Sequence, residues 1–401
     1  KMILRVPDYF DEFECIAGRC RHSCCAGWEV EIDEKTFDYY KAVPGAFGDR
    51  LRQNMSEGEE DSFILINNRC PFLNEKNLCD IYTELGEDTL CETCTDYPRV
   101  TFTYGNIMER CLGLSCEEAC RLIFAEEKPF RIVEREIPDE PVPEQETQYA
   151  DDTDEPEVDE DEEDVDTRED WEYIREARDY ALILLQNREK PLGARLEEYL
   201  VFADRVQECL NWEEPWKIEA VIAEMKTEQK LPEYESDFAL NQLEAMRERA
   251  GFYEPMEILD EEWPGTLAHL LETLAGEDKT EADYIGLHNE FAEFYHDRYY
   301  EWEQILCYFT YRHFMRAVYD YRFLSQAKLA VTSFLMIRDM DVVRYLDNGH
   351  RYSVEDRVDV ARIYAREMEH SEENLENLAE DFDFEEIFSL EQMREQVRAI
   401  R

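Results

Sequence analysis

Eleven of the thirteen cysteines in this 401-residue chain lie between Cys15 and Cys120, and this crowding constrains the fold more than any other feature. Such a density is typical of disulfide-stapled scaffolds and of metal-binding domains. The first residues contain no apolar signal-peptide core, so we expect a cytoplasmic protein with reduced thiols. Clustered thiols in a reducing compartment indicate metal ligands, with disulfides and incidental buried thiols as the alternatives.

The charge of the chain restricts its partners. It carries 43 Lys and Arg against 98 Asp and Glu, a formal net charge of −55. A field of this sign repels phosphate backbones and anionic lipids, so we expect neither a nucleic acid nor a membrane surface as partner. No apolar stretch approaches the ~20 residues that span a bilayer. The charge favours a basic, lysine-rich protein as the partner, with high solubility as the alternative meaning of the charge.

Composition divides the chain into three regions and predicts a mainly α protein. Residues 1–135 are predicted to form a small irregular cysteine-rich metal-binding domain, with a hairpin near 100–108 and a short helix over 117–127. Residues 136–168 are strongly acidic and predict a disordered linker. Its alternative role is to attract a lysine-rich partner or to cover a basic surface as a pseudosubstrate. Residues 169–401 predict an all-α helical domain.

The helical domain is predicted from apolar residues at three- and four-residue spacing. The first such pattern runs from Leu182 to Leu210. Further amphipathic stretches lie near 216–226, 236–250, 265–275, 280–323, 326–346, 353–370 and 384–400. The segment 284–323 is unusually rich in aromatic residues, which we expect to form core rather than a ligand cage. Cys209 and Cys307 lie on apolar helix faces and are expected to be small core residues.

The spacing of the cysteines favours an iron–sulfur cluster, with zinc as the alternative metal. Adjacent side chains diverge, so Cys24 and Cys25 suit two different irons or two different sites better than a single zinc. Cys91 and Cys94 form the one Cys-x2-Cys pair of the kind that structural zinc sites repeat. Several soft thiolates with few nearby histidines are typical of iron–sulfur ligation. His22 is either a further ligand or an ordinary loop residue.

Two familiar sites for S-adenosylmethionine are missing from the sequence. A radical-type site presents Cys-x3-Cys-x2-Cys, but Gly27 stands where a third cysteine would follow Cys20 and Cys24. No Gly-x-Gly-x-x-Gly follows a predicted strand, so no Rossmann-type pocket is visible.

The order of the cysteine motifs resembles a known family. The motifs are Cys15-Ile-Ala-Gly-Arg-Cys-Arg-His-Ser-Cys-Cys-Ala-Gly-Trp-Glu-Val, Asp33, Cys70-Pro-Phe-Leu-Asn, Leu78-Cys79-Asp-Ile-Tyr, Leu85-Gly86-Glu87, Thr93-Cys94, Tyr97-Pro98-Arg99 and Leu114-Ser115-Cys116. Together they resemble the flagellin lysine-N-methylase family, which is itself similar to a wider zinc/iron-chelating Cys-x3-Cys-Cys/Cys-Pro-Phe-Leu group. The resemblance covers about residues 13–124, with a looser aromatic likeness over 284–323.

This resemblance implies methyl transfer from S-adenosylmethionine to flagellin lysines in a protein that carries a [4Fe-4S] cluster. The cysteines carried over as ligands are Cys15, Cys20, Cys24, Cys25, Cys70, Cys79, Cys94 and Cys116. The family's Ser-Cys-Pro-Glu becomes Ser-Cys-Glu-Glu here, and Cys91, Cys111 and Cys120 are additional cysteines. We expect these three to pack, with a second site as the alternative. The acidic linker leaves open whether the substrate is flagellin or another basic surface.

Methylation of lysine needs a neutral amine, whose pKa in water is about 10.4. A site must therefore desolvate the ammonium or accept its proton, and must align nitrogen, methyl carbon and sulfur. Tyr97 and Arg99 are the candidate catalytic residues, and Arg99 and Trp28 the candidate donor-binding residues, because they lie beside predicted ligands. Arg99 suits the carboxylate of the donor or, alternatively, the thiolates of a cluster. The alternative functions are a non-enzymatic metal-binding or redox module that recruits a basic partner, and a zinc-stapled scaffold.

Overall fold

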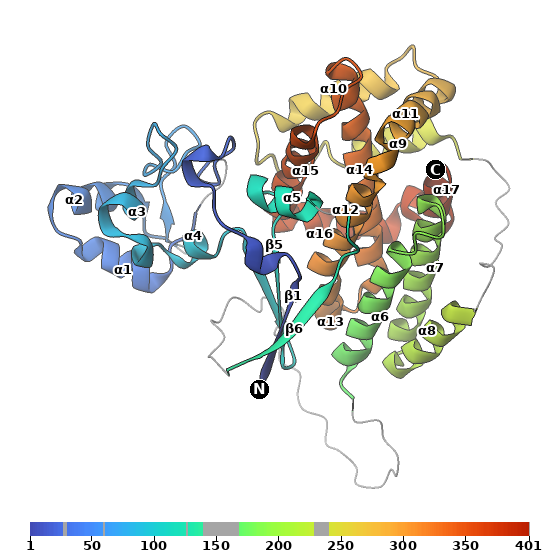
Figure 1. Cartoon of the computed structure of the whole chain (residues 1–401), viewed down its shortest axis with the longest axis horizontal. Coiled ribbons are helices and arrows are strands. Elements are labelled where there is room, and N and C mark those ends of the chain that lie inside the picture. Colours follow the sequence, from blue (N-terminus) through green and yellow to red (C-terminus); the bar gives the residue numbers. More distant parts are fainter. Residues whose placement is uncertain (27–29, 59–60, 126, 139–167, 228–239, 401) are drawn as a thin grey trace, which may run out of the picture.

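A computed structural model describes residues 1–26, 30–58, 61–125, 127–138, 168–227 and 240–400. A small lobe stands beside a larger helical body, and a sheet lies against the body near the junction (Figure 1). Helices dominate the described residues, which confirms the predicted mainly α class. The predicted linker 136–168 lies outside the described residues except at its two ends.

The small lobe is built from short elements around its own core. These are α1 (Glu34–Ala42), α2 (Gly45–Gln53), β2 (Met55–Ser56), β3 (Ser62–Phe63), α3 (Asp80–Leu85) and α4 (Glu92–Asp96). The side chain of Asp33 caps α1 by accepting a hydrogen bond of 2.9 Å from the Thr36 amide. Phe37, Tyr40 and Phe72 are buried at its centre. No long helical period was expected here, and the two nine-residue helices were not predicted.

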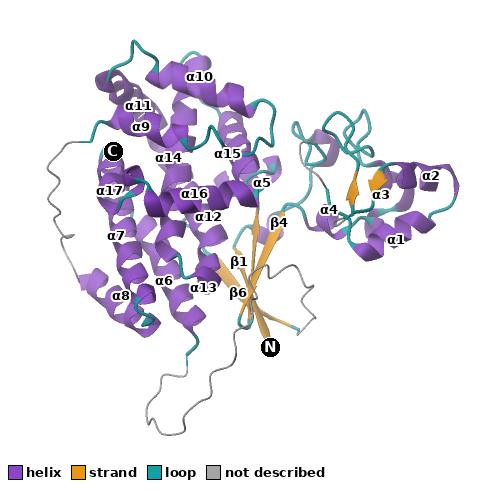
Figure 2. Cartoon of the chain, turned by 180° about the vertical axis from the view of Figure 1, so that it is seen from behind, coloured by secondary structure: helices purple, strands orange, loops and turns teal. Residues whose placement is uncertain are grey.

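A four-stranded sheet joins the N-terminus to later segments, in the order β4-β5-β1-β6. The predicted hairpin is confirmed as β4 (Arg99–Tyr104) and β5 (Ile107–Leu112), an antiparallel pair. Strand β1 (Met2–Pro7) runs parallel to β5 and antiparallel to β6 (Ile132–Ile137), and neither β1 nor β6 was predicted. Figure 2 shows this sheet in orange against the helices of the body.

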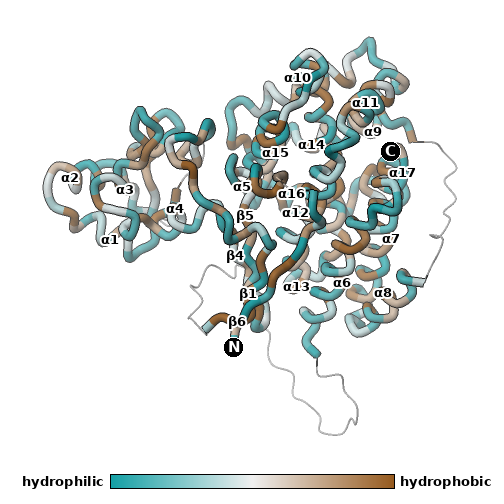
Figure 3. Tube along the Cα trace, in the orientation of Figure 1, coloured by the Kyte–Doolittle hydropathy of each residue, from teal (hydrophilic) through white to brown (hydrophobic). Residues whose placement is uncertain are grey.

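The helical body accounts for the rest of the described chain. The predicted short helix is α5 (Glu117–Phe124), which contacts α15. The others are α6 (Asp170–Leu185), α7 (Leu192–Asn211), α8 (Ile218–Thr227), α9 (Gln242–Gly251), α10 (Trp263–Ala275), α11 (Glu281–Tyr295), α12 (Tyr299–His313), α13 (Ala317–Asp320), α14 (Phe323–Asp347), α15 (Val354–Glu369), α16 (Glu372–Phe384) and α17 (Leu390–Arg398). Figure 3 shows hydrophobic segments alternating with hydrophilic ones along these helices, as amphipathic helices require.

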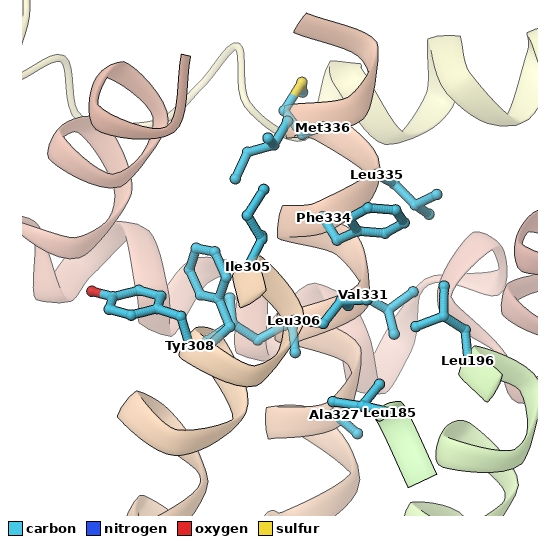
Figure 4. Close-up of a cluster of buried hydrophobic side chains, with 14 of the residues drawn as sticks. Leu185, Leu196, Ile305, Leu306, Tyr308, Ala327, Val331, Phe334, Leu335 and Met336 are labelled. Carbon is cyan, nitrogen blue, oxygen red and sulfur yellow. The ribbon is translucent and has the colours of Figure 1, made fainter. Parts of the chain in front are cut away.

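Helix α14 forms the middle of the core and is buried on nearly every face. Leu185, Leu196, Ile305 and Val331 lie together around it in Figure 4, from α6, α7, α12 and α14. The aromatic stretch is core, as expected, although it is not one continuous helix. Short 3-10 turns divide it into α11, α12 and α13, and no Pro or Gly in those turns signals the breaks. Cys209 and Cys307 are buried, which confirms their expected place in the core.

Buried charges fasten the sheet to the body. Glu109 on β5 accepts hydrogen bonds from Arg5 at 2.8 Å and from Arg178 on α6 at 2.5 Å. The hydroxyl of Tyr311 donates a bond of 2.8 Å to the Arg5 carbonyl. Residues of β4, β5 and α5 share one hydrophobic cluster with the helices. The sheet and α5 therefore form part of the body, and the small lobe projects beside them. Over the described ranges, no helix has the length and apolar content that crossing a bilayer requires.

Candidate functional site

The predicted ligand cysteines divide at the adjacent pair Cys24 and Cys25. We call Cys15, Cys20, Cys24 and Cys116 the junction set, because Cys116 is the N-cap of α5, which lies where the body meets the lobe (Figure 1). We call Cys25, Cys70, Cys79, Cys91 and Cys94 the lobe set, because these residues pack on the core of the small lobe. The thiol of Cys24 hydrogen-bonds to that of Cys25, which raises the pKa of Cys24 and lowers that of Cys25 to about 7. The pair thus joins the two sets.

The junction set gathers around Cys116. Cys15, Cys20 and Cys24 each interact electrostatically with Cys116, although the first three lie about a hundred residues earlier in the chain. Burial, together with neighbouring cysteines and carboxylates, raises the pKa of Cys20 and of Cys116 to about 11. These thiols are therefore protonated at neutral pH, and a bound metal ion would displace their protons.

Glu117, which the sequence analysis did not single out, holds the junction set together. Its side chain is 1% exposed and accepts the backbone amides of Arg21 at 2.9 Å and His22 at 3.3 Å. Its Oε2 also lies 3.6 Å from the Sγ of Cys20. The carboxylate thereby fixes the Cys20–Cys24 loop beside the N-terminus of α5. The only sequence signal is that Glu replaces the family's Pro directly after Cys116.

The lobe set surrounds a hydrophobic centre. The Cys70 amide donates a hydrogen bond of 2.8 Å to the Cys25 carbonyl, which joins two segments 45 residues apart. Cys70 and Cys91 are buried in the lobe core, and Cys25, Cys79 and Cys94 pack against it. The thiols of Cys91 and Cys94 hydrogen-bond to each other, which lowers the pKa of Cys91 and raises that of Cys94. Cys91, which the family resemblance did not include among the ligands, therefore lies beside the cysteines of this set that it did include.

Backbone amides point at several sulfur atoms of the lobe set. Burial raises the pKa of Cys70 to about 12, and a hydrogen bond from the Phe72 amide opposes that rise. The amides of Tyr82 and Ile81 act in the same direction on Cys79. Such N–H groups stabilise a thiolate, and hydrogen bonds to sulfur are a usual feature of iron–sulfur sites.

The thiols are neighbours but do not form a closed ligand shell. Within the residues that the structure describes, no three His, Cys, Asp or Glu side chains form a group that could hold a metal ion. His22 Nε2 lies 3.2 Å from Asp359 on α15, so its ring faces a carboxylate. Cys111 and Cys120 are buried in the core that includes the helical body, and the Cys120 thiol donates a hydrogen bond of 2.9 Å to the Leu114 carbonyl.

Of the candidate methyl-transfer residues, Tyr97 lies nearest the junction set. Its hydroxyl is 3.1 Å from Ser115 Oγ, and its ring is 6.2 Å from that of His370 at the end of α15. Burial, followed by Cys116 and Cys24, raises the pKa of Tyr97 well above 10. The guanidinium of Arg99 lies over the ring of Phe13, 5.1 Å from its centre. Trp28 lies outside the described residues.

A buried polar network connects the junction set to the helices. The hydroxyl of Tyr308 on α12 accepts the Leu114 amide at 3.1 Å and donates to Glu369 at 2.9 Å. His313 Nε2 lies 2.8 Å from the same carboxylate. Burial opposes ionisation of Glu369, yet the His313 contact lowers its pKa. The segment that carries Cys116 is therefore anchored to α12 and α15. This contact was not predicted, because nothing in the sequence distinguishes Tyr308 from the many other aromatic residues of its segment.

Comparison with known proteins identifies the helical body. The family described as "FliB lysine N-methylase C-terminal domain" matches residues 178–394, which is more than half of the chain. The chain belongs to this FliB family. The match spans α7 to α16 in full and covers the core that contacts the junction set through Tyr308 and Glu369. The family match over the helical half of the chain thus confirms the predicted membership of the flagellin lysine-N-methylase family, which the sequence analysis based on the cysteine motifs.

Individual relatives of the FliB-family chain come from Salmonella. Lysine-N-methylases of Salmonella choleraesuis and Salmonella typhimurium are each 30% identical over 139 residues, or 33% of this chain and 35% of theirs. The flagellar biosynthetic protein FliU of Salmonella muenchen is 32% identical over 120 residues, 28% of this chain and 71% of that protein. The match therefore spans about a third of the length of the two lysine-N-methylases. No solved structure matches the chain.

Proposed function

We propose that this FliB-family protein is an S-adenosylmethionine-dependent protein-lysine N-methyltransferase that carries a [4Fe-4S] cluster and acts on flagellin or a similar basic protein. The observation that carries the proposal is the match of residues 178–394 to a lysine N-methylase domain. The names of two relatives support the reaction, and the flagellar name of a third supports the substrate. A cytoplasmic location, which keeps thiols reduced, suits such a cluster.

The thiol sets suit an iron–sulfur cluster by the number and kind of their donor atoms, although their side chains, in the part of the chain that the structure describes, are not arranged as a ligand shell. Each set offers at least four cysteines, and thiolates are the usual ligands of both [2Fe–2S] and [4Fe–4S] clusters. Amides that donate to Cys70 and Cys79 supply the hydrogen bonds that such sulfurs accept. The residues that would hold a cluster are therefore those of the junction set and the lobe set. A bound cluster supplies iron, either as a redox centre or as a structural clamp, and zinc in the same thiols is the alternative metal.

Charge and burial support lysine as the reacting group. The net charge of −55 attracts a basic protein and repels a nucleic acid. Tyr97 lies beside Cys116 and Cys24, and burial raises its pKa further above the ordinary value of about 10, at which the hydroxyl is already protonated at neutral pH. A protonated hydroxyl can orient a neutral amine by hydrogen bonding, whereas proton removal needs an accessible carboxylate or solvent. Arg99 is the candidate partner for the donor carboxylate.

The test is methyl transfer by anaerobically purified protein. The protein is incubated with S-adenosylmethionine and a lysine-rich flagellin, and the substrate is examined by intact-mass and peptide mass spectrometry. We expect mass increments of one methyl group on lysine residues. Arg99→Lys should raise KM for the donor, while Arg19→Lys, an exposed arginine in the same half of the chain, serves as the matched control. Unmodified flagellin with full metal content would refute the enzyme and favour the non-enzymatic metal-binding or redox module.

A further inference from the structure

The adjacent residues Cys24 and Cys25 belong to different surroundings. Cys24 interacts with Cys116, the N-cap of α5, and with Cys15, the first cysteine of the sequence. Cys25 is bonded through its carbonyl to the Cys70 amide and packs on the core of the lobe. The two thiols hydrogen-bond to each other, but their other thiol neighbours differ. Cys24 has Cys116 and Cys15 as neighbours, whereas Cys25 has Cys70, Cys79 and Cys94.

We propose that the chain holds two separate metal centres, one in the junction set and one in the lobe set, with Cys24 and Cys25 supplying one thiolate to each. This inference rests on the metal-binding part of the proposed function. The junction set contains four thiols, which is the complement that a [4Fe–4S] cluster or a structural zinc takes. In the lobe set, Cys25, Cys70 and Cys79 supply three, and the Cys91–Cys94 pair supplies the fourth.

Contacts to the helical body fix the chain on both sides of the cysteine pair. Glu117 binds the amides of Arg21 and His22 and so keeps the Cys20–Cys24 loop against α5. On the other side, the Arg366 guanidinium of α15 donates a hydrogen bond of 3.0 Å to the carbonyl of Ala26, directly after Cys25. Anchors thus lie on both sides of the cysteine pair.

The two centres would have different mechanical roles. All the thiols of the lobe set come from the small lobe, so a metal ion there stabilises the lobe internally. The junction set combines the N-terminal loop with Cys116, whose segment Tyr308 holds to the body. A metal ion there would fasten the loop leading into the lobe to the body.

The experiment measures metal content and spectra of the full chain after anaerobic reconstitution with ferrous iron and sulfide. We expect two clusters, or about eight irons if both are [4Fe–4S], per wild-type chain. Cys116→Ser and Cys70→Ser should each lose half of the iron, and electron paramagnetic resonance of the reduced proteins should show that each variant loses a different signal. Cys209→Ser, which changes a buried cysteine of the helical body, should retain all of it.

Cys24→Ser and Cys25→Ser provide an independent pair, because these positions are less buried than Cys70 and are adjacent in the chain. They should divide the two signals in the same way, while far-ultraviolet circular dichroism confirms that the variants are folded. One cluster per wild-type chain, or complete loss of iron in both Cys116→Ser and Cys70→Ser, would overturn the inference. Two clusters without methyl transfer would leave it standing and refute the proposed enzyme, whereas one cluster with methyl transfer would do the reverse.

Discussion

Tyr308→Phe isolates the contact between the cysteine-bearing segment and the FliB domain. The substitution removes one hydroxyl and keeps the ring. That hydroxyl accepts the Leu114 amide at 3.1 Å and donates to the Glu369 carboxylate at 2.9 Å. Leu114 is 0% exposed and Tyr308 is 1% exposed, so water cannot replace either bond without opening the core.

The expected loss follows from the two partners that remain. A buried amide left without an acceptor costs about 1–3 kcal/mol, and a hydrogen bond to a charged group contributes about 1.5–3 kcal/mol. His313 still contacts Glu369 in the variant, which keeps the carboxylate from being wholly unpaired. We therefore expect Tyr308→Phe to lower the free energy of unfolding by about 2–5 kcal/mol.

Urea unfolding followed by circular dichroism provides the measurement, with the change taken from the midpoint at constant m-value. Tyr319→Phe is the matched control, because its hydroxyl donates a bond of 2.8 Å to the Thr103 carbonyl but the residue is 39% exposed. Water can replace that bond, so a change within about 0.5 kcal/mol is expected. Equal effects of the two substitutions, or a loss below about 1 kcal/mol for Tyr308→Phe, would refute the role given to the buried network.

Three further predictions concern the stability of the body. Glu109→Gln removes one of the two carboxylates that Arg5 and Arg178 share and leaves Asp179 as the other. The substitution should lower the free energy of unfolding in urea by about 1–3 kcal/mol, whereas exposed Glu136→Gln should cost almost nothing. Burial lowers the pKa of His288 to about 4, so below pH ~6.5 the unfolded chain binds a proton that the folded chain excludes. The free energy of unfolding should therefore fall as the pH drops from about 6.5 to 4, and it should fall less steeply in His288→Asn. A Cβ on Gly105 would lie 2.4 Å from the side chain of Trp171, whereas a Cβ on Gly349, which has a similar φ, would meet open space. Gly105→Ala should therefore lower the melting temperature more than Gly349→Ala. A midpoint of unfolding that does not change with pH would contradict the His288 argument, and equal shifts of the two glycine variants would contradict the Gly105 argument.

Local sequence patterns predicted the elements that depend on local information. The hairpin of β4 and β5 follows from an alternating run and a Gly-Asn turn, and most helices of the body follow from their apolar periodicity. Strand β1 could not be found in this way, because its two partners come from residues 107–109 and 132–137. Helix α16 falls between two predicted stretches and was missed.

The metal-ligand role of the cysteines stays a prediction from the sequence, whereas their division into two sets is seen only in the fold. Cysteine density and spacing indicated ligands, and the adjacency of Cys24 and Cys25 already disfavoured a single zinc. Assignment of each thiol to a set needs the fold, because Cys116 joins Cys20 only through the α5 terminus and Glu117. Tyr308 and Glu369 carry no motif, and their role follows from burial and partners that lie far away in sequence.

The place of β1 in the sheet has a consequence for synthesis of the chain on the ribosome. This first strand lies between β5 and β6, so its two edges are covered only when residues 107–112 and then 132–137 have emerged. Every cysteine of both sets precedes β6 and can leave the ribosome while one edge of β1 is still open. Metal loading during translation would therefore act on a nascent chain whose sheet is unfinished, and truncation before residue 132 would expose an aggregation-prone edge.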